Sequence, residues 1–401
     1  MREVVIVGYL RTAQSRCRPS DPPRDWFHKL RADDLLARLL PEVIKRTGIE
    51  AEEIDDFIVG SAMGVNEQWS YGGRFPIFLA NLPHTIAAKF VDQQCGSAMA
   101  GIHIGFMEIA MGFADTVMIG GMEHMTRVAM GAVVGEKGPI SPNMRLFTDP
   151  AYTHWDMMTT MNMGFTAEKL FAQSGCTKEE MDRWAVRSHR LAAKAQNEGF
   201  FKDEILPIEA RQGDGKMMTV ERDQAVRGDT TLEQVKDLKP AYRPDGVITA
   251  AVSSPLNAAA TSIILMSADT ARKKGLKPLA KIRSIGFAGV DPTIMGAGPV
   301  PASRKALAAA GLEAKEIDFW EINEAFAIVV LNCIRELSID PERVNVMGGG
   351  LAIGHPLGAT GVRLVGTLAR ILQAKGGRYG LANACVGGGQ GVATIIEREP
   401  S

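Results

Sequence analysis

The stretch FVDQQCGSAMAGIHIGF, residues 90–106, places a single cysteine where a strand-like segment changes into a helical pattern of small residues. A helix N-terminus carries roughly half a positive charge and unpaired N–H groups, so we expect it to depress the pKa of Cys95 and favour the nucleophilic thiolate. The small residues that follow leave room for a substrate and for close backbone packing. The alternative is an inert buried thiol, the commonest state of a free cysteine.

On both sides of this stretch, strand-like runs alternate with helical patterns, which is typical of an α/β protein. EVVIVGY (3–9) is followed by the helical RADDLLARLLPEVIKRTG (31–48) and then by DDFIVGSA (55–62). Residues 126–246 are instead rich in Met, Pro, Gly and charge, and we interpret them as an inserted loop domain.

The C-terminal part repeats the N-terminal plan. LAKIRSIGFAG (279–289) echoes the first strand-like run, and the segment around His355 echoes the segment around Cys95. The repeat predicts two similar mixed-sheet α/β halves related by a pseudo-twofold axis, with both helix starts facing one cleft. The predicted units are an N-terminal half, the loop domain and a C-terminal half, spanning residues 1–125 with 247–275, 126–246, and 276–401.

The composition is that of an ordinary globular protein. The chain has 401 residues and a formal net charge of −1, which argues against nucleic acid or an anionic membrane surface as its main partner. No apolar run approaches the roughly 18–20 residues that span a bilayer. The five cysteines form no C-x-x-C pair, so we predict no metal site and a reducing, cytoplasmic location.

Two glycine-rich motifs supply further candidate groups. In GGGLAIGHPLGATG (348–361), His355 precedes a proline that is typical of a helix start, and the helix dipole would keep the imidazole neutral and basic. In CVGGGQG (385–391), Cys385 ends a strand-like run, where a thiol could exchange a proton or stay inert. A packed histidine and a tight turn are the alternatives.

A fourth motif, EINEAFA (321–327), puts two polar residues before a long apolar stretch. Asn323 and Glu324 could simply cap the following helix. Asn323 could instead orient a water or contribute to an oxyanion site.

Together these motifs resemble the thiolase family across essentially the whole chain. The matching segments, in chain order, are CGSAM at Cys95, GGMEHM (120–125), DPTIMGAGPVPASRKAL (291–307), NEAF (323–326), GHPLGATG (354–361) and CVGGGQG (385–391). The resemblance implies a layered α-β-α-β-α sandwich with an inserted loop domain. It also implies cleavage of a 3-ketoacyl-CoA by coenzyme A, or the reverse Claisen condensation, without a tightly bound cofactor.

The resemblance further implies a role for each site residue. Cys95 carries the acyl group, His355 takes its proton, and Cys385 is the acid and base at the alpha carbon of acetyl-CoA. Asn323, through a water, and His355 form one oxyanion hole. The N–H groups of Cys95 and Gly388 form the other.

The loop domain corresponds to the part of the family fold that holds the nucleotide and pantetheine of CoA. Arg227 lies where the family has an arginine beside the adenine, and Ser254 matches a serine near the pantetheine. Met163 and Met295 match positions that line the acyl pocket in some members, with ordinary core packing as the alternative. Phe326, at the end of NEAF, is included in this predicted binding set.

The chain departs from the family pattern at one edge of the CoA site. Where many members read SGxNDGAAA, this chain has SPLNAAATS: Pro255 replaces a glycine, and Ala258 and Ala259 replace Asp-Gly. The change could shift the pantetheine or the substrate size. Asn162 stands where short-chain biosynthetic members often have a histidine, which favours the degradative, β-oxidation-type branch.

Three alternatives remain open at this point. One is a short-chain acetoacetyl-CoA thiolase, one is a ketosynthase-type condensing enzyme, disfavoured by Cys385, and one is a non-catalytic scaffold subunit. The resemblance also implies a homodimer or homotetramer and allows a multienzyme β-oxidation partner.

Overall fold

The computed structural model describes residues 1–135 and 138–399. Its central feature is a mixed β-sheet with strand order β11-β12-β13-β10-β1-β9-β5-β3-β4. Two short strands extend it: β2 pairs with the start of β9, and β6 pairs with the end of β1. The strands are β1 (Val4–Thr12), β2 (Ser15–Arg16), β3 (Asp56–Gly60), β4 (Ala87–Val91), β5 (Thr116–His124), β6 (Ile205–Leu206), β9 (Asn257–Ser267), β10 (Ala280–Gly289), β11 (Phe319–Ile322), β12 (Tyr379–Val386) and β13 (Gln390–Glu397).

The sheet has the same order when read outward from its middle in either direction. β1 and β10 pair antiparallel, with Val5 opposite Lys281. On one side follow β9 and β5, each antiparallel to the strand before, and then the parallel β3. On the other side β13, β12 and the parallel β11 follow in the same way. The predicted pair of similar mixed-sheet halves is confirmed, and the β1–β10 pair joins them.

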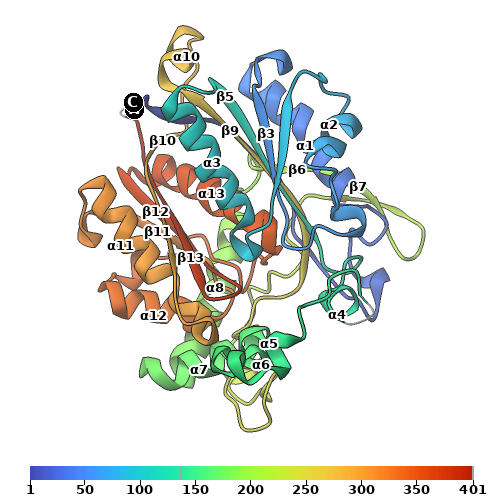
Figure 1. Cartoon of the computed structure of the whole chain (residues 1–401), viewed down its shortest axis with the longest axis vertical. Coiled ribbons are helices and arrows are strands. Elements are labelled where there is room, and N and C mark those ends of the chain that lie inside the picture. Colours follow the sequence, from blue (N-terminus) through green and yellow to red (C-terminus); the bar gives the residue numbers. More distant parts are fainter. Residues whose placement is uncertain (136–137, 400–401) are drawn as a thin grey trace.

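Helices cover both faces of each half and produce five layers. α1 packs on β1, β5 and β9, whereas α3 packs on β3 and β5. In the second half α11 packs on β10 and β13, and α13 packs on β11 and β12. α3 and α13 pack against each other in the middle layer (Figure 1). The helices of these layers are α1 (Ala32–Thr47), α3 (Ser97–Met111), α11 (Pro299–Ala310), α12 (Ala327–Leu337) and α13 (Thr360–Lys375), with the short α2 (Arg74–Leu79) and α10 (Ala268–Lys273) at the periphery.

The alternation of side chains along β9 explains this layering. Ile264 and Met266 belong to the apolar cluster beneath α1, while Ile263 and Leu265 belong to the cluster shared with α3. Successive strand residues point to opposite faces, so a strand covered on both faces reads as a continuous apolar run. All of β9 is buried accordingly.

The two central helices approach most closely near their N-termini. A Cβ atom at Gly361 would lie 2.3 Å from the backbone nitrogen of Met99. Backbone cannot yield as a flexible side chain does, so only glycine fits at this crossing. The close approach keeps the segments that carry Cys95 and His355 next to each other.

We therefore expect Gly361→Ala to lower the free energy of unfolding by about 2–4 kcal/mol, because the added methyl group pushes the helices apart. The measurement is a urea denaturation midpoint. Gly131→Ala is the control, since a Cβ atom there meets nothing within 4 Å. Equal losses of stability in the two variants would show that the crossing is not as tight as described.

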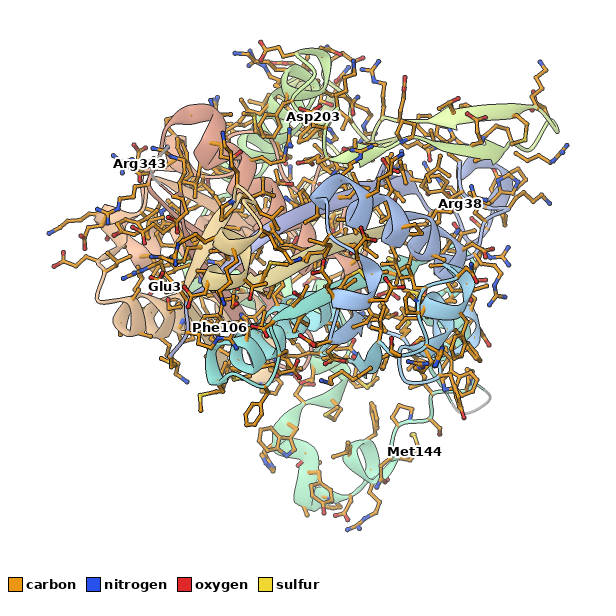
Figure 2. The ribbon with its side chains drawn as sticks, turned by 90° about the horizontal axis from the view of Figure 1, so that it is seen from above. Glu3, Arg38, Phe106, Met144, Asp203 and Arg343 are labelled. Atoms are coloured by element: carbon orange, nitrogen blue, oxygen red, sulfur yellow. The ribbon has the colours of Figure 1, made fainter. Side chains whose placement is uncertain are left out.

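The segment predicted to be an inserted loop domain contains mostly helices. α8 begins with a capping box between Thr177 and Glu180. Figure 2 shows the β7–β8 hairpin and the segment around Met144 projecting from opposite sides of the body. The elements are α4 (Met130–Val133), α5 (Arg145–Thr148), α6 (Met157–Thr160), α7 (Met163–Ser174), α8 (Lys178–Asn197), β7 (Ile208–Arg211), β8 (Met217–Val220) and α9 (Leu232–Val235).

β6 also belongs to this segment, yet it pairs with β1 of the main sheet. The boundaries at 126–246 therefore stay a prediction. Across residues 1–135 and 138–399, no helix is both long and apolar enough to cross a membrane.

Candidate active site

Cys95 lies in a 3-10 turn, Gln94–Gly96, that leads directly into α3. The hydroxyl of Ser97 holds this turn by accepting from the Gln93 N–H at 2.9 Å and donating to the Gln94 carbonyl at 2.6 Å. Gln94 has a φ of 47°, an uncommon value outside glycine. The thiol is thus held at the start of α3, and its side chain is buried.

The predicted depression of the Cys95 pKa is wrong for the protein without a substrate. Burial raises the pKa of this thiol to about 12, and the negative charge of Glu123 adds to the rise. The backbone N–H of Gly387 acts in the opposite direction by donating toward the sulfur. Desolvation of a thiolate therefore outweighs the helix dipole here. At neutral pH Cys95 is a thiol, and a base must remove its proton as it attacks.

His355 precedes the 3-10 turn Leu357–Ala359 that opens α13. Its Nδ1 lies 2.7 Å from the hydroxyl of Thr360, and its backbone N–H donates to Oδ1 of Asn257 at 2.9 Å. Burial lowers the pKa of His355 to about 3, and the charge of Arg363 acts in the same direction. The ring is neutral, as expected, although burial contributes more than the helix dipole. With an Nδ1–H donating to Thr360, Nε2 is the free base.

Cys385 lies near the end of β12, directly before the turn to β13. Gly388 and Gly389 in this turn have φ values of 81° and 78°, which favour glycine. Burial raises the pKa of Cys385 well above its usual value, and the nearby Cys95 raises it further. The turn contacts the other thiol as well, since Gly387 donates toward Cys95. The two cysteines, from different halves of the chain, therefore face one another.

Asn323 completes this group of side chains. Its backbone N–H donates to the Asn383 carbonyl on β12, and its amide nitrogen lies 3.3 Å from Nε2 of His355. Its Oδ1 is buried without a hydrogen-bond partner among the described residues. A buried polar atom with no partner costs about 1–3 kcal/mol, so it marks a position for a ligand or water.

The alternative that Asn323 and Glu324 cap the next helix is wrong. α12 begins at Ala327, and Phe326 occupies its N-cap position without a side-chain cap. Glu324 instead accepts hydrogen bonds from side chains and backbone at 2.6–3.0 Å, namely those of Trp184, Ser188, Asn345 and Leu351.

The structure adds positioning groups to which the sequence analysis gave no role. Glu123 accepts backbone N–H bonds from Ala62 and Gly358, each at 2.9 Å, and so ties the loop after β3 to the start of α13. Burial raises the pKa of Glu123 to about 7. Asn257 and Thr360 both hold His355. These residues lie in the motifs GGMEHM, SPLN and GHPLGATG, but only the contacts of the folded chain show that they position the site.

The predicted CoA-binding residues fall into two groups. Met295 and Phe326 belong to one apolar cluster with Cys385, and Met163 packs against it. Ser254 adjoins them, since its backbone N–H donates to the Ala325 carbonyl at 3.0 Å. Arg227 is exposed elsewhere, on the loop after β8, and its backbone N–H donates to His189.

A cavity of about 640 Å³ opens beside the β12–β13 turn. It lies between the main body and the projecting segment around Met144 (Figure 2). Its lining includes Gly388, Pro292, Trp155, Met157 and Leu146. The mixture of apolar side chains and a backbone turn suits a flexible organic chain that ends near the two thiols.

Comparisons with known proteins agree with this architecture. Residues 4–269 match the thiolase N-terminal domain, and residues 276–398 match the thiolase C-terminal domain. The chain therefore belongs to the thiolase family.

Several relatives and solved structures are similar over their full length. A 3-ketoacyl-CoA thiolase of Marinobacter nauticus is 41% identical over 99% of this chain and 98% of its own, and one of Saccharophagus degradans is 40% identical over the same shares. The crystal structure of Bacillus anthracis acetyl-CoA acetyltransferase has a TM-score of 0.86 at 35% identity, covering 100% of this chain and 99% of its own. Human mitochondrial 3-ketoacyl-CoA thiolase has a TM-score of 0.87 at 32% identity, covering 99% of each chain.

Proposed function

We propose that the protein is a 3-ketoacyl-CoA thiolase, an acyl-CoA:acetyl-CoA C-acyltransferase that cleaves 3-ketoacyl-CoA with coenzyme A through a cysteine acyl-enzyme. The observation that supports this most is that two buried thiols lie close together and that the turn carrying Cys95 packs on the turn that follows the neutral His355. The relatives with this name add support over nearly the whole chain.

In the proposed first step, Cys95 attacks the 3-keto carbonyl while Nε2 of His355 takes the thiol proton. A neutral base is needed because the pKa of Cys95 is raised to about 12. The N–H groups of Cys95 and Gly388 stabilise the negative oxygen that forms on the ketone, because the adduct on the sulfur lies beside the N–H of the nucleophile itself. The bond between the alpha and beta carbons then breaks, leaving the acyl group on sulfur.

In the same step Cys385 gives its proton to the departing alpha carbon, which leaves as acetyl-CoA. Asn323, through a water, and the protonated His355 stabilise the enolate oxygen of its thioester. A second CoA thiol then gives its proton to the Cys385 thiolate and takes the acyl group from Cys95, whose sulfur recovers its proton from His355. The reverse sequence is a Claisen condensation. This chemistry calls for no tightly bound cofactor, because CoA and acyl-CoA are the substrates.

A group of four neighbouring arginines indicates that part of the substrate is an anionic nucleotide. Burial lowers the pKa of Arg16 to about 10, and the charges of Arg18, Arg227 and Arg24 lower it further. Such mutual repulsion is relieved by phosphate groups. We assign the CoA nucleotide to this cluster and the pantetheine to the region of Ser254.

Arg227→Gln should raise KM for CoA about tenfold and change kcat less, because it removes charge far from the reacting atoms. The measurement is thiolysis of one 3-ketoacyl-CoA over a range of CoA concentrations. Arg272→Gln, which removes an exposed arginine paired with Asp269 on α10, is the matched control. An unchanged KM in Arg227→Gln would place the nucleotide elsewhere.

A short-chain acetoacetyl-CoA thiolase is the second candidate, favoured by the similarity to the Bacillus anthracis acetyl-CoA acetyltransferase. Thiolysis rates across 3-ketoacyl-CoA chain lengths separate the two. Activity on medium and long chains supports the first proposal, activity on the four-carbon substrate alone supports the second, and no thiolysis of any chain length refutes both.

We also propose that the protein works as a cytoplasmic homodimer or homotetramer in a β-oxidation-type degradation, with a multienzyme partner as one option. Strand β4 is at one edge of the sheet, and aromatic side chains near it are exposed, including Trp69, Tyr71 and Phe78. Unpaired edge strands and exposed apolar groups are typical of association surfaces. Light scattering of the purified chain tests this.

A further inference from the structure

A second cluster of reactive side chains lies outside the proposed active site. Cys17, Asp25 and His124 come from three separate segments, and one ligand atom of each lies within 4.8 Å of the others. All three side chains are buried. In the described part of the chain, this is the one group of three or more His, Cys, Asp and Glu residues with such geometry.

The surroundings fix the imidazole so that a lone pair faces the cluster. Nε2 of His124 lies 3.1 Å from the Phe27 carbonyl, which can only accept, so Nε2 carries the proton. Nδ1 is then unprotonated. It lies 4.0 Å from Sγ of Cys17 and 3.9 Å from Oδ2 of Asp25.

The carboxylate is held in the same manner. Oδ1 of Asp25 accepts from the Ser15 hydroxyl at 2.5 Å and from the Phe27 N–H at 2.9 Å, while Oδ2 accepts from the Thr126 hydroxyl at 2.5 Å. These donors all come from outside the cluster. Between the three ligand atoms, the only hydrogen is that of the Cys17 thiol, a weak donor that points toward Asp25, while Thr126 donates toward the sulfur.

We propose that Cys17, Asp25 and His124 form a three-ligand Zn²⁺ site, with the fourth position left to a water. Zinc takes sulfur, nitrogen and carboxylate ligands at about 2.0–2.3 Å, so tetrahedral binding holds these atoms about 3.3–3.6 Å apart. The observed separations from Nδ1, 4.0 Å to Cys17 and 3.9 Å to Asp25, would therefore shorten by a few tenths of an ångström on binding. A ligating histidine almost always donates its other N–H to a carbonyl or carboxylate, and ligating carboxylates are themselves hydrogen-bonded, as both are here. Cys17 binds as the thiolate and releases its proton to solvent.

The site would connect two parts of the fold that carry other functions. Cys17 and Asp25 delimit a loop that follows β2 and contains Arg18 and Arg24, whereas His124 ends β5. The neighbouring Glu123 ties the turn before α13 to the loop after β3. Zinc would thus fix the arginine-bearing loop to the strand end that supports the active site. The proposal does not depend on the thiolase reaction.

The experiment measures metal in the full-length protein, incubated with zinc chloride and then freed of loose metal by gel filtration. Mass spectrometric metal analysis should find about one zinc per chain, and Cys17→Ser should reduce retention at least about tenfold. Cys176→Ser, which alters another buried free cysteine, should retain zinc like the wild type. Equal retention in all three proteins, or none in the wild type, would overturn the site.

A second measurement on the wild type needs no variant to fold. Cobalt(II) bound to a thiolate gives a sulfur-to-metal charge-transfer absorption in the near ultraviolet, and excess zinc should remove it. Absence of this band after cobalt addition shows that Cys17 is simply a buried thiol beside His124.

Discussion

Cys95→Ala should reduce thiolysis by at least about 10⁴-fold while CoA binding stays within about twofold of the wild type. The proposed reaction has no other group that can carry the acyl chain, because Cys385 is assigned to proton transfer. CoA binding survives since the arginine cluster is on a different part of the surface. Steady-state thiolysis and calorimetric titration with CoA measure the two effects.

The covalent step can be observed directly. Intact-mass spectrometry after incubation with acyl-CoA should show one added acyl group on the wild type and none on Cys95→Ala. Cys176→Ala is the control, because it removes a buried thiol of α7–α8 without touching the site. Acylation of Cys95→Ala at a normal rate would mean that another residue is the nucleophile.

The uncharged states of Cys95 and His355 determine how the nucleophile is activated. The pKa of Cys95 is raised to about 12 and that of His355 is lowered to about 3, so both are uncharged between these values. Burial therefore favours the neutral thiol and imidazole over a preformed thiolate–imidazolium pair in the free protein. Activation is general-base catalysis at the moment of attack, and the substrate oxygen receives the charge.

Much of the fold could be predicted because local patterns recur in both halves. The echo between residues 2–12 and 279–289 corresponds to β1 and β10, which occupy equivalent positions. The joining of the two halves through this strand pair could not be predicted, because antiparallel pairing of segments so far apart leaves no signal in either one. The hydrogen bond from His355 to Asn257 could not be predicted for the same reason, because the two residues are 98 positions apart.

The pKa of the Cys95 thiol was harder to predict than the position of Cys95 in the fold. The position of Cys95 before a helix of small residues is visible in the sequence, whereas its raised pKa depends on burial in the folded chain and on the charge of Glu123. The cluster of Cys17, Asp25 and His124 was not predicted from the sequence, for a similar reason. Spacing rules find metal ligands that are close in sequence, and these three meet only after β1 and β5 have joined the sheet.

Cys385→Ala should separate the two half-reactions. Exchange of an acyl group between acyl-CoA and Cys95 involves no carbon–carbon bond, so it should continue within about threefold of the wild type. Claisen condensation and cleavage of 3-ketoacyl-CoA need a proton at the alpha carbon, so both should fall by at least about 10³-fold. The measurements are acylation of Cys95 by intact mass and acetoacetyl-CoA formation from acetyl-CoA.

Cys176→Ala is the matched control for this variant, because Cys176 is buried in the same apolar cluster as Cys385 and is not among the groups that shift the pKa of Cys385. It removes the same atoms from that core and should leave both reactions near the wild-type rate. If Cys385→Ala lost exchange and condensation equally, the role of Cys385 would be packing within the site and not proton transfer. Retained exchange with lost condensation would assign the proton transfer to Cys385. A packing defect at the end of β12 would instead also displace Gly387 from the Cys95 sulfur, and acylation would then be slowed as well.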